Sequence, residues 1–194
     1  MKRLLMIMIT VLALSACTMP STKIYSLSIP VEKDAASAKS GASVNILIHS
    51  PRYLSQSYIA YRVSPYQLEI SRYSKWDSTP NEMVKEALKD SLSATGIFNE
   101  VRTSNFTVSG FYTVDVNLKR FERSDNGSDS FAELAFDVVL ISPEGRELYR
   151  NSVSKRSKLD ERGFLSLARV LSSVLPEGLA EVKAGMIKAI PSGT

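Results

Sequence analysis

The chain has 194 residues, with 24 basic and 20 acidic side chains, one cysteine and one histidine. Cleavage after residue 16, argued below, removes Lys2 and Arg3 and leaves 178 residues with 22 basic and 20 acidic side chains. The resulting net charge of +2 does not support nucleic-acid binding. A single cysteine excludes a disulfide within the chain, so the fold depends on core packing.

The first residues have the pattern of a secretory signal. Lys2 and Arg3 precede residues 4–14, which are apolar apart from Thr10. As a helix this run is about 16 Å long, too short for a hydrocarbon core of roughly 30 Å. Residues 1–16 are therefore predicted to be a cleaved signal peptide.

Cys17 is the predicted lipid attachment site. Residues 14–17, Leu-Ser-Ala-Cys, resemble the bacterial lipobox, in which the cysteine thiol receives a diacylglycerol and the signal is cut just before it. The alternative is a plain signal peptide with an incidental buried cysteine. Two or three acyl chains, at about 0.8 kcal/mol per buried CH₂, anchor a protein stably. By analogy with lipoprotein sorting, Thr18 instead of aspartate favours the periplasmic face of the outer membrane.

After a lipidated tether over residues 17–22, the predicted elements begin with strands. A first strand is expected within 21–28, a polar loop over 32–41 and a buried strand over 44–48. Residues 58–63 and 66–70 predict a hairpin that turns at Ser64 and Pro65.

A helix over 80–95 is the clearest predicted element. Thr79 offers an N-cap, Pro80 occupies the first helical position and Glu82 suits a capping box. Apolar residues then recur at helical spacing, and Gly96 supplies a stop.

Three antiparallel strands and a helix are predicted for the rest of the chain. The strands are expected over 106–121, 130–141 and 147–157, joined by short turns. Apolar spacing then predicts a helix from Phe164 to Ile187, kinked or split by Pro176. The fold class is therefore α+β: a single domain over 23–190 with a mostly antiparallel sheet and two main helices on one face.

Tyrosine, tryptophan and arginine side chains concentrate between residues 52 and 76, which makes this segment the candidate binding surface. Such residues are enriched at interface centres and also suit lipid headgroups. The alternative is that the aromatic residues face the core or cover a sheet edge. The candidate partner- or lipid-binding residues are Arg52, Tyr53, Tyr61, Arg62, Tyr66 and Trp76.

The same segment resembles a known family. Pro51-Arg52-Tyr53-Leu54, Ile59-Ala60-Tyr61-Arg62, Ser64-Pro65-Tyr66-Gln67-Leu68-Glu69 and Trp76 before a helix are similar to the motifs of the ABC-type transport auxiliary lipoprotein family, which includes PqiC-like subunits. The resemblance covers about residues 23–190. It implies a non-enzymatic subunit that works with a periplasmic MCE-domain tube and a separate permease and ATPase, and supports envelope integrity. A homo-oligomeric ring would suit the symmetry of a tube.

No catalytic or cofactor motif was found. Glycine-rich phosphate loops and a G-x-S-x-G elbow are absent. His49 has no cysteine or second histidine to form a zinc site, and it is interpreted as a structural residue. The basic residues Arg150, Lys155, Arg156, Lys158 and Arg162 are interpreted as a solvated face, with an anionic lipid or acidic partner as the alternative.

Two functional hypotheses follow. The first is an outer-membrane adaptor of an MCE-type transport system, which docks through the aromatic and arginine hairpin. It expects Tyr66→Ala or Arg62→Ala to impair function while the fold stays intact. The second is a periplasmic carrier that holds acyl chains in an apolar groove between the helices and the sheet. A hydrolase is a weaker third hypothesis, and no cofactor is expected.

Overall fold

The computed structural model describes residues 20–30 and 40–190. The predicted signal peptide, Cys17 and most of the predicted loop over 32–41 lie outside these residues. The elements in chain order are β1 (Lys23–Tyr25), β2 (Ser43–His49), the 3₁₀ turn η1 (Arg52–Ser55), β3 (Tyr58–Ser64), β4 (Gln67–Trp76), α2 (Pro80–Ser93), β5 (Glu100–Thr103), β6 (Tyr112–Asn126), β7 (Asp129–Ile141), β8 (Glu147–Lys158) and α3 (Phe164–Ala189).

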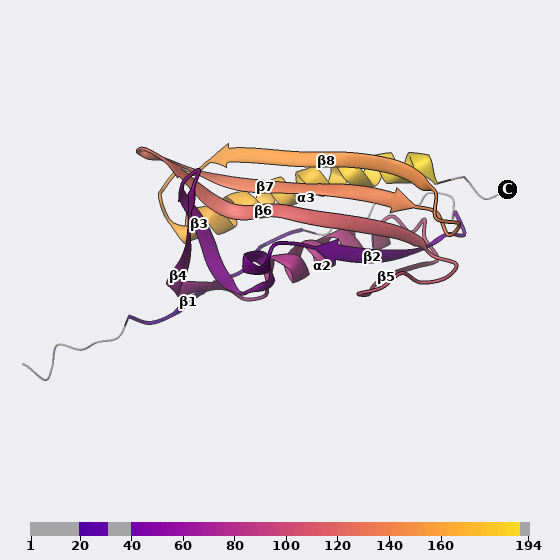
Figure 1. Cartoon of the computed structure of the whole chain (residues 1–194), viewed down its shortest axis with the longest axis horizontal. Helices are drawn as coiled ribbons and strands as arrows, with labels where there is room; N and C mark the ends of the chain where they lie inside the picture. The colour runs from indigo at the N-terminus through magenta and orange to yellow at the C-terminus, as the bar shows by residue number, and fades with distance from the viewer. Residues whose placement is uncertain (1–19, 31–39, 191–194) are drawn as a thin grey trace, which may run out of the picture.

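Strand β6 organises the sheet. One edge of β6 pairs with β7 in antiparallel fashion along its whole length, and β7 pairs with β8 in the same way. The other edge pairs in parallel with β2 near its start and with β3 near its end. β3 then forms an antiparallel hairpin with β4, and the short β1 adds in parallel to β4 (Figure 1).

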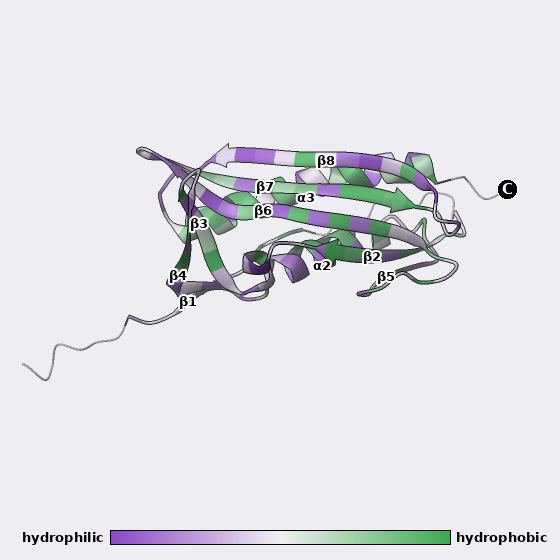
Figure 2. Ribbon diagram, viewed as in Figure 1, coloured by the Kyte–Doolittle hydropathy of each residue, from purple (hydrophilic) through white to green (hydrophobic). Residues whose placement is uncertain are grey.

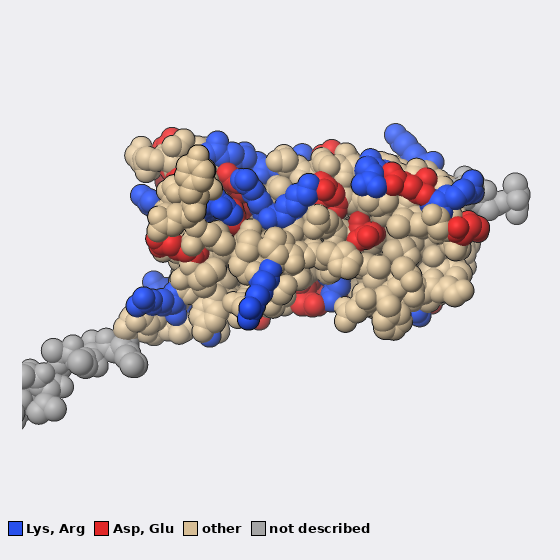
Figure 3. Space-filling view, viewed as in Figure 1, with Lys and Arg blue, Asp and Glu red and all other residues tan. Residues whose placement is uncertain are grey.

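Neither of the described helices lies on the face of β6, β7 and β8 that is turned toward the viewer in Figure 1. Hydrophilic and hydrophobic residues alternate along β6 and β8, as expected for strands with one face in the core (Figure 2). Lysine, arginine and acidic side chains are mixed across this open face (Figure 3). It is therefore a charged surface with both signs interspersed.

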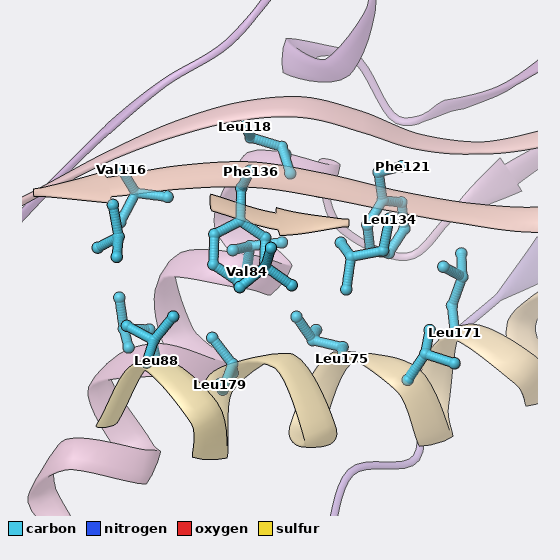
Figure 4. Packing of buried hydrophobic residues seen from close by; sticks show 14 of the residues in the cluster. Val84, Leu88, Val116, Leu118, Phe121, Leu134, Phe136, Leu171, Leu175 and Leu179 are labelled. Carbon is cyan, nitrogen blue, oxygen red and sulfur yellow. The ribbon is translucent and has the colours of Figure 1, made fainter. Parts of the chain in front are cut away.

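Both helices pack on the opposite face. α3 contacts β7 and β8, while α2 contacts β2, β5 and α3. Figure 4 shows side chains of β6 and β7, among them Phe121 and Phe136, pointing toward Leu88 of α2 and Leu175 of α3. The α+β prediction, with a mostly antiparallel sheet and two helices on one face, is confirmed.

Helix α2 begins as predicted. Thr79 Oγ1 accepts a hydrogen bond from the Glu82 backbone N–H at 3.2 Å, and Pro80 is the first helical residue. The Glu82 carboxylate binds Lys85 Nζ at 2.7 Å instead of closing a capping box. The helix ends at Ser93, two residues earlier than predicted.

Strand β6 differs from its predicted range of 106–121. It begins at Tyr112 and continues to Asn126. A bulge between Leu118 and Arg120 shifts its register against β7, so alternation in the sequence breaks there although the strand continues. The four-residue β5 was not predicted, because only Val101 marks it as a strand.

Helix α3 runs through Pro176 without a break, so of the two predicted outcomes, a kink or a split, the split is wrong. Proline removes one backbone hydrogen bond. Buried residues on both sides of it, including Leu171, Leu175, Leu179 and Met186, hold the two halves against the sheet. Within the described ranges, no helix is both long enough and apolar enough to cross a membrane.

Gly178 lets α3 approach β8 closely. A Cβ at this position would lie 2.9 Å from Val153 Cγ1 and 3.6 Å from Phe136 Cε1. Both neighbours are buried, and a β-branched valine within a strand has little freedom to move away.

We expect Gly178→Ala to destabilise the protein by about 1–3 kcal/mol through overpacking, despite the better helix propensity of alanine. Thermal unfolding followed by circular dichroism measures the loss. The same substitution in a Val153→Ala background should cost less, because the clashing methyl group is gone. Equal costs in the two backgrounds would contradict the close approach.

Candidate functional site

The β3–β4 hairpin and η1 carry all six candidate binding residues predicted from the sequence, but the structure gives them different environments. Tyr66 lies in the turn of the hairpin, between Ser64 and Gln67, and is 98% exposed. Arg52 is exposed at the start of η1. These two side chains are free to meet a partner.

Trp76 is a core residue, which corrects its placement on the candidate surface. It is 2% exposed, and its ring meets Phe121 edge to face with centroids 5.5 Å apart. The tryptophan before the helix therefore stabilises the junction between β4 and β6 and cannot contact a partner directly.

Arg62 and Tyr53 surround a buried carboxylate that the sequence analysis missed. The Glu122 side chain is fully buried, and Arg62 Nε donates to its Oε1 at 2.8 Å. Tyr53 of η1 donates its hydroxyl hydrogen to the Lys119 carbonyl at 3.2 Å. Burial first, and the nearby Glu122 carboxylate second, raise the pKa of Tyr53 to about 12. Arg62 and Tyr53 therefore hold the hairpin and η1 to β6.

Tyr61 belongs to a second polar cluster, between β3 and the start of α3. Its hydroxyl donates to Glu69 on the neighbouring strand. The ring lies 5.7 Å from the Phe164 ring and 4.6 Å from the guanidinium carbon of Arg123. This guanidinium is buried between two aromatic rings, since its carbon is also 4.8 Å from the Phe164 ring centre.

Asp125 is the anion of this cluster. Arg162 Nη2 and Ser130 Oγ donate to it at 2.8 and 2.7 Å, and Arg123 Nε lies 3.0 Å from Oδ1. Burial would raise the pKa of Asp125, but the Ser130 hydroxyl and the two arginines together lower it below its ordinary value. Asp125 is thus an ionised, fully paired group, which points to a structural role.

An open hollow of about 660 Å³ lies beside the cluster. It is bounded by Tyr61, Arg123 and Phe164 and by five residues of β4, Glu69 to Tyr73. Polar and aromatic side chains of β3, β4 and the start of α3 adjoin one another there.

The basic residues near the carboxyl end are paired with carboxylates at the protein surface, as the interpretation of a solvated face expects. Arg150 binds Glu147, Lys155 binds Glu181 and Lys158 binds Asp129. Arg156 and Arg120 share Glu133.

His49 is the last residue of β2, with its Nε2 3.5 Å from Asp115 Oδ1 and most of its side chain exposed. Among the described residues there is no group of three or more histidine, cysteine or acidic side chains that could hold a metal ion.

Solved structures share this fold at low identity. The crystal structure of a protein from Xanthomonas campestris matches with a TM-score of 0.77 and 15% identity, over 87% of this chain and 96% of that one. The crystal structure of an uncharacterized protein matches with a TM-score of 0.67 and 15% identity, over 86% of this chain and 99% of that one. A comparison with curated proteins gave no match.

The family assignment comes from the sequence. The model of the ABC-type transport auxiliary lipoprotein component matches residues 25–182. This range includes the β3–β4 hairpin, all of α2, β6, β7 and β8, and α3 as far as Val182. This confirms the resemblance seen in the motifs between Pro51 and Trp76. The chain belongs to the ABC-type transport auxiliary lipoprotein family.

Proposed function

We propose that this transport-associated, envelope lipoprotein is a non-enzymatic adaptor on the periplasmic face of the outer membrane. Acyl chains on Cys17 hold it there. The hairpin turn docks to the far end of an MCE-type periplasmic tube, whose permease and ATPase are separate subunits, and so supports envelope integrity. The family's description as an auxiliary component supports a role beside a transporter.

The observation that carries the docking proposal is the environment of Tyr66. This aromatic ring is 98% exposed at the turn of the hairpin, whereas Tyr73 is 48% and Tyr58 37% exposed, Tyr61 is engaged with Glu69 and Phe164, and Trp76 is buried. Exposed tyrosines are typical binding anchors, because a rigid ring buries a large area at low entropic cost. Tyr66 also falls inside the segment with the family's most distinctive motifs.

We expect Tyr66→Ala to weaken binding to the MCE subunit by roughly 30-fold, the effect of losing a hot spot of about 2 kcal/mol. The measurement is co-purification and direct titration of the lipoprotein with the MCE subunit, together with complementation of detergent sensitivity in a deletion strain. Phe106→Ala is the matched control, because Phe106 is a large exposed apolar residue in the loop before β6.

Wild-type affinity and complementation by the Tyr66 variant would place the docking surface elsewhere. A loss shared by the Phe106 variant would indicate a general effect of removing exposed aromatic area.

Anchoring makes a separate prediction. Cys17→Ser should move the protein from the outer-membrane fraction to the soluble periplasmic fraction and abolish incorporation of labelled palmitate, because no thiol remains for acylation. Fractionation and autoradiography measure both effects. Unchanged membrane fractionation of this variant would contradict the proposed anchor.

The alternative, a carrier that encloses acyl chains, receives less support from the structure. Side chains of both helices fill the layer beneath the sheet (Figure 4). The groove beside α2 is lined not only by Leu27, Ile29, Met83 and Ala87 but also by four carboxylates, which suit acyl chains poorly. It holds about 280 Å³, below the usual range of ligand pockets. Native mass spectrometry distinguishes the two: stoichiometric co-purified phospholipid would favour the carrier.

The proposal includes self-association into a ring, because a rotationally symmetric tube favours a symmetric receiver. Size measurement of the detergent-solubilised lipoprotein tests this part independently.

A further inference from the structure

An exposed apolar and basic patch lies where the chain enters the sheet. Ile24 of β1 and Tyr58 of β3 both pair with Lys75 of β4, so the three form one cross-strand row. Ile24 is 68% exposed, Tyr58 is also exposed, and Lys75 Nζ lies 4.4 Å from the centre of the Tyr58 ring. Large apolar side chains thus flank a lysine on the surface.

Further residues of the same type adjoin this row. β1 runs parallel to β4 and begins with Lys23 opposite Ser74. Tyr73 and Arg72, which precede Ser74, therefore lie on the side from which the chain arrives, and both are exposed. Consecutive strand residues point to opposite faces, so Lys23 and Ile24 lie on either side of the short edge strand β1. We call the six residues around this edge the β1 patch: Lys23, Ile24, Tyr58, Arg72, Tyr73 and Lys75.

The cations of the β1 patch are not neutralised. Within the described part of the chain, Lys23, Arg72 and Lys75 form no ion pair, whereas Lys119, Arg120, Arg150, Arg156 and Lys158 of the long sheet all do. The carboxylates nearest in sequence do not pair with them. Asp77 lines the groove beside α2 with Glu82 and Glu86, and Glu69 accepts hydrogen bonds from Tyr61 and Gln67. The β1 patch therefore presents positive charge to its surroundings.

The position of the anchor limits what can cover this patch. Lys23 is six positions beyond Cys17, a contour length of at most about 22 Å at ~3.6 Å per residue. With acyl chains on Cys17 in the bilayer, the patch cannot move further than this from the membrane surface. A protein partner would have to compete with a headgroup layer that is always within reach.

We propose that the β1 patch rests on the bilayer surface as a second membrane contact, in addition to the acyl chains, and binds anionic phospholipid headgroups. Ile24, Tyr58 and Tyr73 sit at the level of the headgroups, where amphipathic aromatic rings are favoured. Lys23, Arg72 and Lys75 meet lipid phosphates. The contact fixes the orientation of the domain and so the direction in which the hairpin turn faces. This inference rests on the proposed anchoring at Cys17.

The experiment places a fluorescent label at the patch in the lipidated, full-length mature protein. Acylation blocks Cys17, so a cysteine introduced as Ile24→Cys or Tyr73→Cys is the only labelling site, and Phe106→Cys is the matched control in the loop before β6. The proteins are reconstituted into phosphatidylcholine vesicles with or without phosphatidylglycerol, which also contain a headgroup-level lipid quencher. We expect quenching at positions 24 and 73, stronger with phosphatidylglycerol, and none at position 106.

Charge reversal tests the electrostatic part. Each basic residue near an anionic surface contributes about 1 kcal/mol, so Lys23→Glu or Lys75→Glu should reduce the membrane-contacting population at least about fivefold and weaken quenching at position 24. Arg146→Glu, in the turn before β8, is the control and should leave quenching unchanged.

The outcomes separate the two proposals. Protein that floats with vesicles but shows equal quenching at positions 24 and 106 keeps the anchor and overturns the surface contact. Protein that does not float overturns the anchor, and the surface contact with it. If quenching at positions 24 and 73 is unchanged by the charge-reversal substitutions, the assignment of anionic headgroups as the ligand is overturned.

Discussion

Replacing Arg62 with alanine is expected to lower the melting temperature by roughly 6–12 °C. The Glu122 side chain is completely buried, and Arg62 supplies its partner cation at 2.8 Å. Removing one member of a buried ion pair costs about 3–5 kcal/mol, because the other charge is left without compensation. Arg62 is 23% exposed, so we expect the lower end, and 1 kcal/mol corresponds to roughly 2–4 °C for a chain of this size.

Two further variants identify the buried charge as the cause. Arg62→Met combined with Glu122→Gln should recover much of the lost stability, because no unpaired charge remains. Arg150→Ala removes a surface arginine that is also paired with a glutamate, and its melting temperature should not change measurably. Arg62→Ala and Arg150→Ala with the same melting temperature would contradict a structural role for Arg62.

This expectation changes the use of Arg62 as a functional probe. The sequence alone predicts that Arg62→Ala impairs function without disturbing the fold. The ion pair with Glu122 means that a loss of function in this variant reports on folding as well as on docking. Tyr66, whose side chain makes no such contact with the described residues, is the cleaner probe of a binding surface.

Local signals in the sequence were sufficient for most elements. Helix α2 was predicted because its cap and its apolar spacing agree, and the β3–β4 hairpin because Ser64 and Pro65 interrupt two strand-like runs. The α+β class followed from the order of these elements. Such features depend on residues close together in the chain, which is why they can be recognised without a structure.

Long-range features could not be predicted in the same way. Strict alternation counted from Leu118 would assign Phe121, Arg123 and Asp125 to the other face of the strand, but the bulge near Lys119 shifts them by one position. The predicted strand therefore ends too early and leaves out Glu122. Nothing local marks Gly178 as a packing residue, because its close neighbours Val153 and Phe136 come from other elements.

The candidate binding residues show the same difference between local and long-range features. The residue types identify the segment from Arg52 to Trp76 as a candidate surface. Whether each of its side chains is buried, however, depends on residues far along the chain. Trp76 packs against Phe121, and Tyr61 against Phe164. The exposed Tyr66 and Arg52 remain as candidates for direct contact with a partner.

Trp76→Ala is expected to destabilise the protein by about 3–5 kcal/mol, the usual cost of removing a large aromatic side chain from a core. Trp76 is 2% exposed, and its loss would leave a cavity beside the edge of the Phe121 ring. Urea unfolding followed by circular dichroism should show a lower midpoint with an unchanged slope. Fluorescence cannot be used for this comparison, because the chain contains one tryptophan.

Trp76→Phe separates the ring from the indole nitrogen. Trp76 Nε1 has no hydrogen-bond partner among the described residues, so phenylalanine loses volume but no hydrogen bond and keeps an aromatic contact with Phe121. It should therefore cost clearly less than alanine. Tyr66→Ala, the truncation of an exposed ring on the same hairpin, should leave the midpoint unchanged. If Trp76→Ala and Tyr66→Ala unfolded at the same urea concentration, Trp76 would have to be returned to the candidate binding surface.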